Sequence, residues 1–258
     1  MASLIRPERM HRSMGTPISF DRVASVYDDT RSLPPDLMEK VIERLKATLE
    51  RHACRTVLDV GVGTGRFASP VSSMGFDVCG ADISAKMLRI ARKKSVQDLL
   101  LADARTLPFR ERSFDASMCV HLLHLILEWE RVLSELNRVT RKVFVSVVDL
   151  KTGEPGMMSH YEDLLIESGW KEIHPGISER TLPEVRPVLE KEYIARREHQ
   201  QLADEALVRI ERREFSSLFD VPEGLHNQII SKLREIYSGK SITLSSDLYL
   251  YVWDARSL

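Results

Sequence analysis

Apolar residues near the start of the chain recur at helical spacing. In residues 36–51 they fall every three or four positions, at Met38, Val41, Ile42, Leu45 and Leu49. This spacing predicts a helix with one buried face. Pro34 and Pro35 come directly before this segment and favour a helix start at this point.

Downstream of this helix, short apolar runs alternate with stretches of helical spacing. The runs are predicted strands at residues 56–61, 77–82, 98–103, 113–120 and 142–149. Predicted helices lie between them, at residues 66–74, 84–94 and 128–139. Almost continuous apolarity in such short runs is typical of parallel strands that are covered on both faces. We therefore expect an α/β fold with a doubly wound sheet.

The pattern changes after Leu150. The turn-rich stretch KTGEPG is followed by a predicted helix, SHYEDLLIESGW, for which Gly169 is the expected C-terminal cap. The stretch WKEIHPGI (170–177) is a candidate strand. Residues 183–215 are highly charged and predicted to be mostly helical, and we interpret the charge run 190–214 as a solvated helix face.

Two elements complete the predicted chain. A helix over 223–237 places Ile229, Ile230, Leu233 and Ile236 on one side. The final stretch, SDLYLYVWD (246–254), alternates polar or aromatic with aliphatic residues and is predicted to be a strand.

Composition is that of an ordinary soluble globular protein, with 43% hydrophobic and 29% charged residues. A net charge of -1 gives no general electrostatic case for nucleic acid or an anionic membrane as partner. No window approaches the roughly 20 apolar residues of a membrane span. Cys54, Cys79 and Cys119 show no CxxC spacing, and the charged start MASLIRPERMHR lacks the apolar core of a signal sequence. We expect a cytoplasmic protein.

The stretch VLDVGVGTG (57–65) carries the first sign of chemistry. A strand, a glycine-rich turn and a helix start bring backbone amides close to a ligand, because glycine permits positive φ and close approach. Dinucleotides and S-adenosylmethionine both bind at such turns. The dinucleotide fingerprint G-x-G-x-x-G needs a glycine at position 66, but this chain has Arg66 there and Gly65 one position early.

Acidic residues stand at the ends of three predicted strands. Asp59 precedes the glycine turn, Asp82 ends the second strand and Asp103 ends the third. Open α/β sheets bind ligands at the carboxyl ends of their strands, where an acid suits ribose hydroxyls. S-adenosylmethionine also carries an ammonium and a sulfonium group, which need carboxylate or carbonyl acceptors. A nucleotide-like ligand explains the three acids together, whereas local capping would explain each separately.

Taken in order, several segments resemble the motifs of class I S-adenosylmethionine-dependent methyltransferases. They are VLDVGVGTGRFA, GADISAKMLRIAR, LADARTLPFRERSFDASMCVHLLHLI, KVFVSVVD and, before the core, SFDRVASVYDDTR. The likeness covers residues 19–150 and is strongest to the small-molecule enzymes of ubiquinone and menaquinone biosynthesis. It implies a Rossmann-like seven-stranded sheet of order 3-2-1-4-5-7-6 whose last strand is antiparallel.

The resemblance also implies a division of the chain. Residues 1–52 would form an N-terminal helical lid segment, and residues 53–150 the cofactor-binding core. Residues 151–258 would belong to the same domain and carry a helical substrate-side insertion at about 183–237. These helices could cover the substrate pocket or mediate a homodimer, and the residues do not separate the two.

Carried over by position, the resemblance assigns the site residues. Asp59, Gly61 and Gly63 would line the methionine part of the cofactor, Gly65 would allow tight packing of the loop on the helix, and Asp82 would hold the ribose hydroxyls. The residues that would contact the adenine are Ile83, Met87, Asp103 and Ala104. Val120 and His121 would border the sulfonium and the substrate entrance. Tyr27 and Arg31 would close over the cofactor from the N-terminal segment.

Methyl transfer from a sulfonium is an in-line displacement, so the protein mainly has to hold the acceptor close and aligned. A base is needed only if the acceptor loses a proton. His121 and His124 lie three residues apart after the fourth strand and would share one side of a helical turn. Either is a candidate base, although lining the pocket is the simpler role. They lack a third ligand nearby, so no metal site is expected.

The favoured hypothesis is an S-adenosylmethionine-dependent methyltransferase that acts on a small molecule and releases S-adenosylhomocysteine. The first alternative is a methyltransferase-like protein that binds the cofactor or a partner without transfer. The second is an enzyme acting on RNA or protein. The stretch CVHLLH stands where adenine-N6 and glutamine methyltransferases carry an N/D-P-P-Y/F sequence, which disfavours those acceptors. The identity of the acceptor is not predicted.

Overall fold

The computed structural model describes residues 20–21, 23–31, 33–170 and 174–257. The chain forms two compact units. The core unit contains Ser19–Leu150, Gly176–Arg196 and Asp247–Leu258. The helical unit contains Lys151–Pro175 and Arg197–Ser246, together with Met1–Ile18, which lies outside the described residues.

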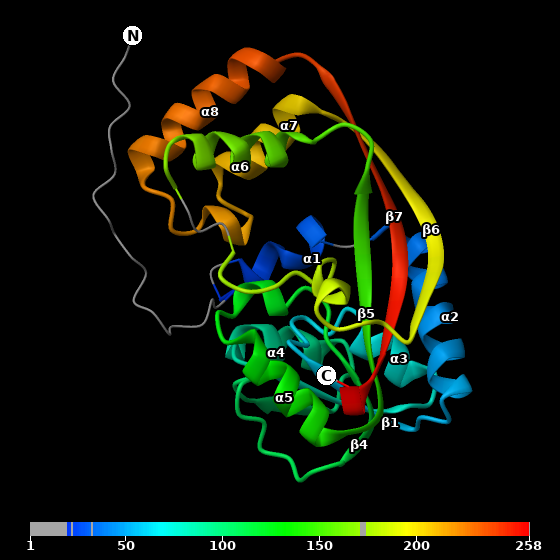
Figure 1. Ribbon diagram of the computed structural model, residues 1–258. Coiled ribbons are helices and arrows are strands. Elements are labelled where there is room, and N and C mark those ends of the chain that lie inside the picture. Colours follow the sequence, from blue (N-terminus) through cyan, green and yellow to red (C-terminus); the bar gives the residue numbers. More distant parts are fainter. Residues whose placement is uncertain (1–19, 22, 32, 171–173, 258) are drawn as a thin grey trace. The chain divides into compact units, whose positions relative to one another are not determined.

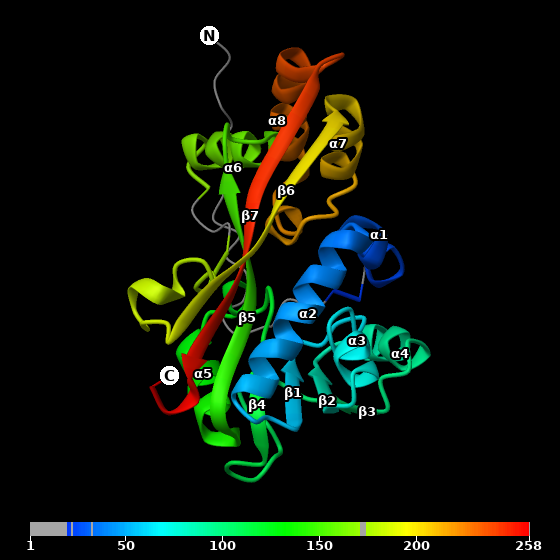
Figure 2. The ribbon, with the colours of Figure 1, turned by 90° about the vertical axis from the view of Figure 1, so that its right-hand side faces the viewer.

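The sheet has seven strands in the order β3-β2-β1-β4-β5-β7-β6. Its first strands are β1 (Thr56–Val60), β2 (Asp77–Asp82), β3 (Asp98–Leu101) and β4 (Phe114–Met118). These pair in parallel, and β4 pairs in parallel with β5 (Thr140–Thr152). Figure 2 shows β7 (Ser241–Asp254) running opposite to β5 and to β6 (Glu190–Leu202). The predicted fold class and strand order are confirmed.

Both faces of the sheet in the core unit are buried. Alternate side chains of β1 enter different clusters, Val57 on one face and Leu58 on the other. The first cluster includes Leu45 of α2 (Pro35–Arg51), and the second includes Leu133 of α5 (Trp129–Val139). This two-sided cover explains why the strands are apolar almost throughout.

Short helices lie before, between and after the strands of the core unit. They are α1 (Tyr27–Arg31), α3 (Ala68–Ser73) and α4 (Ala85–Lys93), with the 3-10 turns η1 (Ala24–Val26), η2 (Leu123–Leu125), η3 (Leu182–Glu184) and η5 (Ala255–Ser257). Ser84 caps α4, because its side-chain oxygen accepts the N–H of Met87 at 3.1 Å. This cap fixes the helix start next to the end of β2.

The helices of the helical unit (Figure 1) share an apolar core of their own. It contains α6 (Met157–Glu167), α7 (Ala203–Glu211), α8 (Glu223–Tyr237) and the turn η4 (Ser216–Leu218). The buried side chains of its helices include Tyr161, Leu165, Leu207, Ile210 and Leu233. The helix predicted over 223–237 is confirmed, and Gly169 follows α6 at a φ of +90°.

Two predictions in the second half of the chain are wrong. Residues 190–202 form the strand β6, not a helix. This strand lies at the edge of the sheet, where charged side chains are common because they discourage pairing with other chains. The candidate strand WKEIHPGI is also absent at residue 170 and at 174–177, while 171–173 lie outside the described residues.

Candidate functional site

The glycine turn follows β1, and its three glycines all adopt positive φ: +74° at Gly61, +56° at Gly63 and +76° at Gly65. A Cβ atom at Gly61 would lie 3.0 Å from Leu122, and one at Gly65 would lie 3.0 Å from Val96. A Cβ at Gly63 would meet only the carbonyl oxygen of Gly61, at 3.9 Å. Gly61 and Gly65 therefore serve packing, whereas the backbone at Gly63 borders open space that a ligand could enter.

Asp82 joins the end of β2 to this turn. One carboxylate oxygen accepts the N–H of Gly63 at 2.8 Å, and the other accepts the N–H of Ser84 at 2.8 Å. Burial raises the pKa of Asp82, although these backbone hydrogen bonds oppose the rise. The structure thus brings a carboxylate directly to the glycine turn, as expected from its place at the end of the strand.

Asp59 is buried at the end of β1, with 4% of its surface exposed. Burial raises its pKa to about 7, the charge of Asp82 adds to the rise, and Arg66 opposes it. A buried carboxyl of this kind is stabilised in its charged form when a cation arrives. The site therefore favours a positively charged ligand group beside Asp59.

Asp103, a predicted adenine contact, pairs with a neighbouring arginine in the structure. Its carboxylate receives Arg105 Nε at 3.1 Å on both oxygens and Arg105 Nη2 at 2.7 Å. This pairing lowers the pKa of Asp103 and the guanidinium also contacts Glu128. A ligand amino group at this carboxylate would have to compete with Arg105.

The other predicted adenine contacts vary in exposure. Ile83 follows Asp82 and is 42% exposed, which leaves an apolar surface beside that carboxylate. Met87 is only 2% exposed. Ala104 and Val120 are half-buried. Of these residues, Ile83 offers the largest apolar surface to a flat ring.

The segment before α2 lies against the glycine turn. Asp28 accepts the hydroxyl of Thr64 at 2.6 Å and pairs with Lys94 at 2.5 Å. Asp21 accepts the hydroxyl of Ser84, and Arg66 donates to the carbonyl oxygen of Arg31. The structure therefore places this segment beside the glycine turn, and its role as a lid over a cofactor stays a prediction.

Within that segment, Tyr27 packs edge-on against Phe20, with ring centroids 5.7 Å apart. Sequence analysis singled out Tyr27 and Arg31 but missed Asp21 and Asp28, which supply the anchoring carboxylates. Nothing in the local pattern distinguishes these two acids from ordinary surface acids.

The loop after β4 has an irregular backbone. His121 is exposed and has a φ of +59°, before the turn η2, so it does not share a helical turn with His124 as predicted. Desolvation by neighbouring protein atoms lowers the pKa of the His121 imidazole, and the negative charge of Glu179 opposes this effect. Leu122 packs against Gly61, which places this loop next to the glycine turn.

Glu179 is a site residue that sequence analysis missed. It is 4% exposed, and its Oε1 accepts the N–H groups of Leu122 at 2.8 Å and Leu123 at 3.1 Å. Its Oε2 lies 3.8 Å from Nδ1 of His124. Burial would raise the pKa of Glu179, but His124, His121 and backbone hydrogen bonds outweigh burial and lower it.

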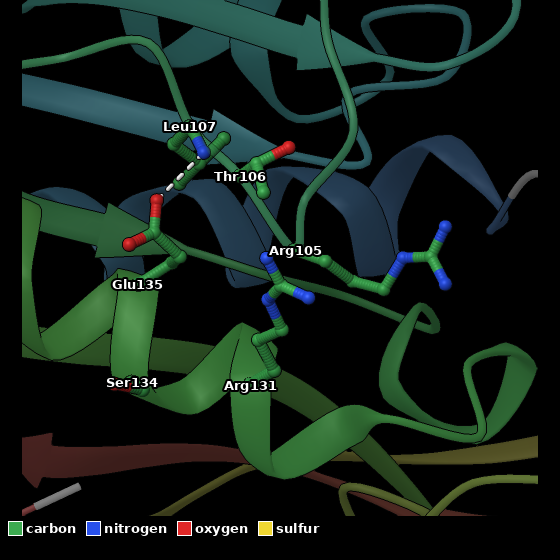
Figure 3. A pocket seen from close by; sticks show the side chains of 6 residues that line it. All are labelled: Arg105, Thr106, Leu107, Arg131, Ser134 and Glu135. Carbon is green, nitrogen blue, oxygen red and sulfur yellow. Dashed lines mark hydrogen bonds between the residues drawn. The ribbon is translucent and has the colours of Figure 1, made fainter.

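A separate hollow of about 380 Å³ lies between the loop after β3 and α5 (Figure 3). It is lined by Arg105, Thr106, Leu107, Arg131, Ser134 and Glu135. Glu135 accepts the N–H of Leu107 at 2.6 Å and pairs with Arg138 at 2.7 Å. We assign this hollow a structural role, since these charges attach the loop to the helix and no glycine-turn residue lines it.

Within the described residues, no group of three or more histidine, cysteine or acidic side chains could hold a metal ion. The same part of the chain contains no helix that is long and apolar enough to cross a membrane.

Comparison with known proteins finds similarity over part of the chain. Residues 58–143 match the family model described as "Methyltransferase domain". The chain is 37% identical over 124 residues to a demethylmenaquinone methyltransferase of Paenarthrobacter aurescens. This match covers 47% of this chain and 49% of that protein. It is 42% identical over 93 residues to a phosphatidylethanolamine N-methyltransferase of Cereibacter sphaeroides, covering 33% and 45% respectively. The chain spans about half the length of these curated relatives.

Among solved structures, the YcgJ protein from Bacillus subtilis superposes with a TM-score of 0.51 at 21% identity. The match covers 81% of this chain and 97% of that one. At this identity the likeness supports the fold alone.

Proposed function

We propose that this chain, which is related through residues 58–143 to the class I S-adenosylmethionine-dependent methyltransferases, transfers a methyl group from S-adenosylmethionine to a small-molecule acceptor. One observation carries the proposal. The open backbone at Gly63 is tied to Asp82 and adjoins the buried Asp59, which suits a ligand with hydroxyl and cationic groups.

The residues present fit this cofactor. Asp59 would receive the cationic methionine part, and the open turn at Gly63 would let the ligand approach the backbone. Asp82 would hold the ribose hydroxyls, and the exposed Ile83 would lie against the adenine. When bound, the cofactor supplies an electrophilic methyl group. Asp103 remains a proposed adenine contact, in competition with Arg105.

The chain's own residues would hold and shield the reactants. The segment anchored by Asp21 and Asp28 would exclude water from the glycine turn. The loop that carries His121 and His124 would border the acceptor. Because displacement at a sulfonium has a good leaving group, alignment of the acceptor contributes more than acid or base chemistry.

The proposal also specifies that the methyl acceptor is a small molecule. The relatives named above act, by their names, on demethylmenaquinone and on phosphatidylethanolamine. The net charge of -1 adds no electrostatic argument for nucleic acid.

We also propose a cytoplasmic location, which agrees with free thiols at Cys54, Cys79 and Cys119. The homodimer stays a prediction, which light scattering can test.

Calorimetric titration with S-adenosylmethionine, S-adenosylhomocysteine and NADH tests the cofactor. Wild-type protein and Asp82→Asn are compared with Asp98→Asn, a matched change at an exposed acid at the start of β3. We expect micromolar binding of both sulfur ligands, at least tenfold weaker in Asp82→Asn and unchanged in Asp98→Asn. NADH binding, or no binding of either sulfur ligand, would refute the proposal.

A further inference from the structure

The segment 176–182 packs closely on the loop after β4. The N–H of Gly176 donates to the carbonyl oxygen of His124 at 3.0 Å. A Cβ at Gly176 would lie 2.0 Å from the carbonyl oxygen of Leu123 and 2.3 Å from that of Ile126, so only glycine allows this approach. Leu182 is fully buried in the same apolar cluster as Leu123. The segment is therefore fixed against this loop at both of its ends.

Glu179 lies in the middle of this segment with its carboxylate buried. A buried charge is costly unless it is hydrogen-bonded or paired. Its Oε1 accepts two consecutive backbone N–H groups, from Leu122 and Leu123. These bonds hold the loop at the point where Leu122 meets Gly61 of the glycine turn. Through this contact, Glu179 supports the wall of the proposed cofactor site.

The second oxygen of Glu179 faces a histidine. Oε2 lies 3.8 Å from Nδ1 of His124, a distance that is too long for a full hydrogen bond but short for a charge interaction. A carboxylate beside Nδ1 favours the tautomer that carries its proton on Nδ1.

The charges of Glu179 and Asp59 also act on one group. Both raise the pKa of the Cys119 thiol, in addition to the larger effect of burial. Cys119 directly follows β4, which pairs with β1. Glu179 and Asp59 are therefore each close enough to Cys119 to act on its thiol, although Glu179 is far from both in the sequence.

We propose that Glu179 is a positioning residue of the methyl-transfer site, and this rests on the function proposed above. Oε1 holds the loop against the glycine turn, and Oε2 favours the tautomer of His124 that carries its proton on Nδ1.

Nitrogen NMR of the histidine rings in the full chain tests the second oxygen. Spectra of wild type, Glu179→Gln and the matched Glu184→Gln are compared, with His124→Gln used to assign the signals; Glu184 is an exposed acid in the same part of the chain. We expect His124 to carry its proton on Nδ1 in wild type and in Glu184→Gln, and to shift toward Nε2–H in Glu179→Gln. An Nε2–H tautomer in wild type, or no change in Glu179→Gln, would overturn the proposal.

Titration with S-adenosylhomocysteine tests the first oxygen. A glutamine can still accept both N–H groups, so Glu179→Gln should bind within about threefold of wild type, whereas Glu179→Ala should bind at least about tenfold more weakly. Equal binding by Glu179→Ala would refute the support of the loop. If wild type binds no cofactor, the proposed function fails, yet the NMR comparison still decides the Glu179–His124 contact. If Glu179→Ala does not fold, the glutamine variant and the wild-type tautomer remain decisive.

Discussion

Replacing Asp59 by asparagine probes the electrostatics of the candidate site directly. Asp59 is buried, and burial together with the charge of Asp82 raises its pKa from 3.8 to about 7. The folded chain therefore holds this proton more tightly than the unfolded chain does. The stabilisation that results is fully present below the unfolded pKa and is lost as the pH rises through about 7.

The magnitude follows from the same shift. With a folded pKa of about 7, protonation of Asp59 contributes about 1.4 kcal/mol to the free energy of unfolding at pH 6, and almost nothing at pH 8. Asparagine cannot titrate, so the free energy of unfolding of Asp59→Asn should fall less over this interval. The expected difference between the two proteins is on the order of 1 kcal/mol.

Urea denaturation without ligand, at pH 6 and at pH 8, measures this difference. Only the change with pH is compared, because a buried asparagine alters the absolute stability by itself. If wild type and Asp59→Asn lose the same free energy of unfolding between the two pH values, the raised pKa is refuted.

The same carboxyl should link ligand binding to pH. If the charged form of Asp59 receives the ligand ammonium group, the fraction ready to bind rises from about one tenth at pH 6 to about nine tenths at pH 8. S-adenosylhomocysteine should therefore bind wild type about tenfold more tightly at pH 8. Asp59→Asn should bind weakly and without this pH dependence, which also corrects for titration of the ligand itself. A flat wild-type profile would remove Asp59 from the cation-binding role.

Two further changes separate ligand binding from packing. Gly63→Ala should weaken S-adenosylhomocysteine binding at least tenfold and cost about 1–2 kcal/mol of stability, because its φ is positive but its surroundings are open. Gly65→Ala should destabilise the fold more, since its Cβ also meets packed side chains, and thermal denaturation would show the contrast. Asp28→Asn weakens the ion pair with Lys94 and should speed ligand dissociation in stopped-flow measurements. Asp29→Asn, a change at the exposed neighbouring acid, should leave that rate unchanged; equal rates in both variants would contradict a closing role.

The local sequence pattern was sufficient to predict those helices and strands whose side chains are buried at regular intervals along the element. The strand 77–82 and the helix 223–237 have the predicted bounds, because continuous apolarity and helical spacing each mark a definite kind of burial. The same logic failed at 190–202, where a run of charged residues forms an edge strand. There the pairing with β7, which no local spacing records, outweighs intrinsic preference.

The candidate site likewise contains features that the sequence pattern predicted and contacts that it did not. The glycine turn and Asp82 were found because both stand at the ends of strands, and parallel strands bring those ends together. Asp103 stands at such an end too, but its pairing with Arg105 was not foreseen, since many conformations place those two side chains apart.

Residue spacing along the chain was enough to predict the α/β class, the glycine turn and the acids at the strand ends, because these depend on one or two elements at a time. The contacts by which Asp28 holds the N-terminal segment to the turn and Glu179 supports the loop after β4 became evident from the folded chain alone. These contacts join residues 36 and 57 positions apart. Such distances are closed by the packing of the whole core unit, and periodicity along the chain carries no information about them.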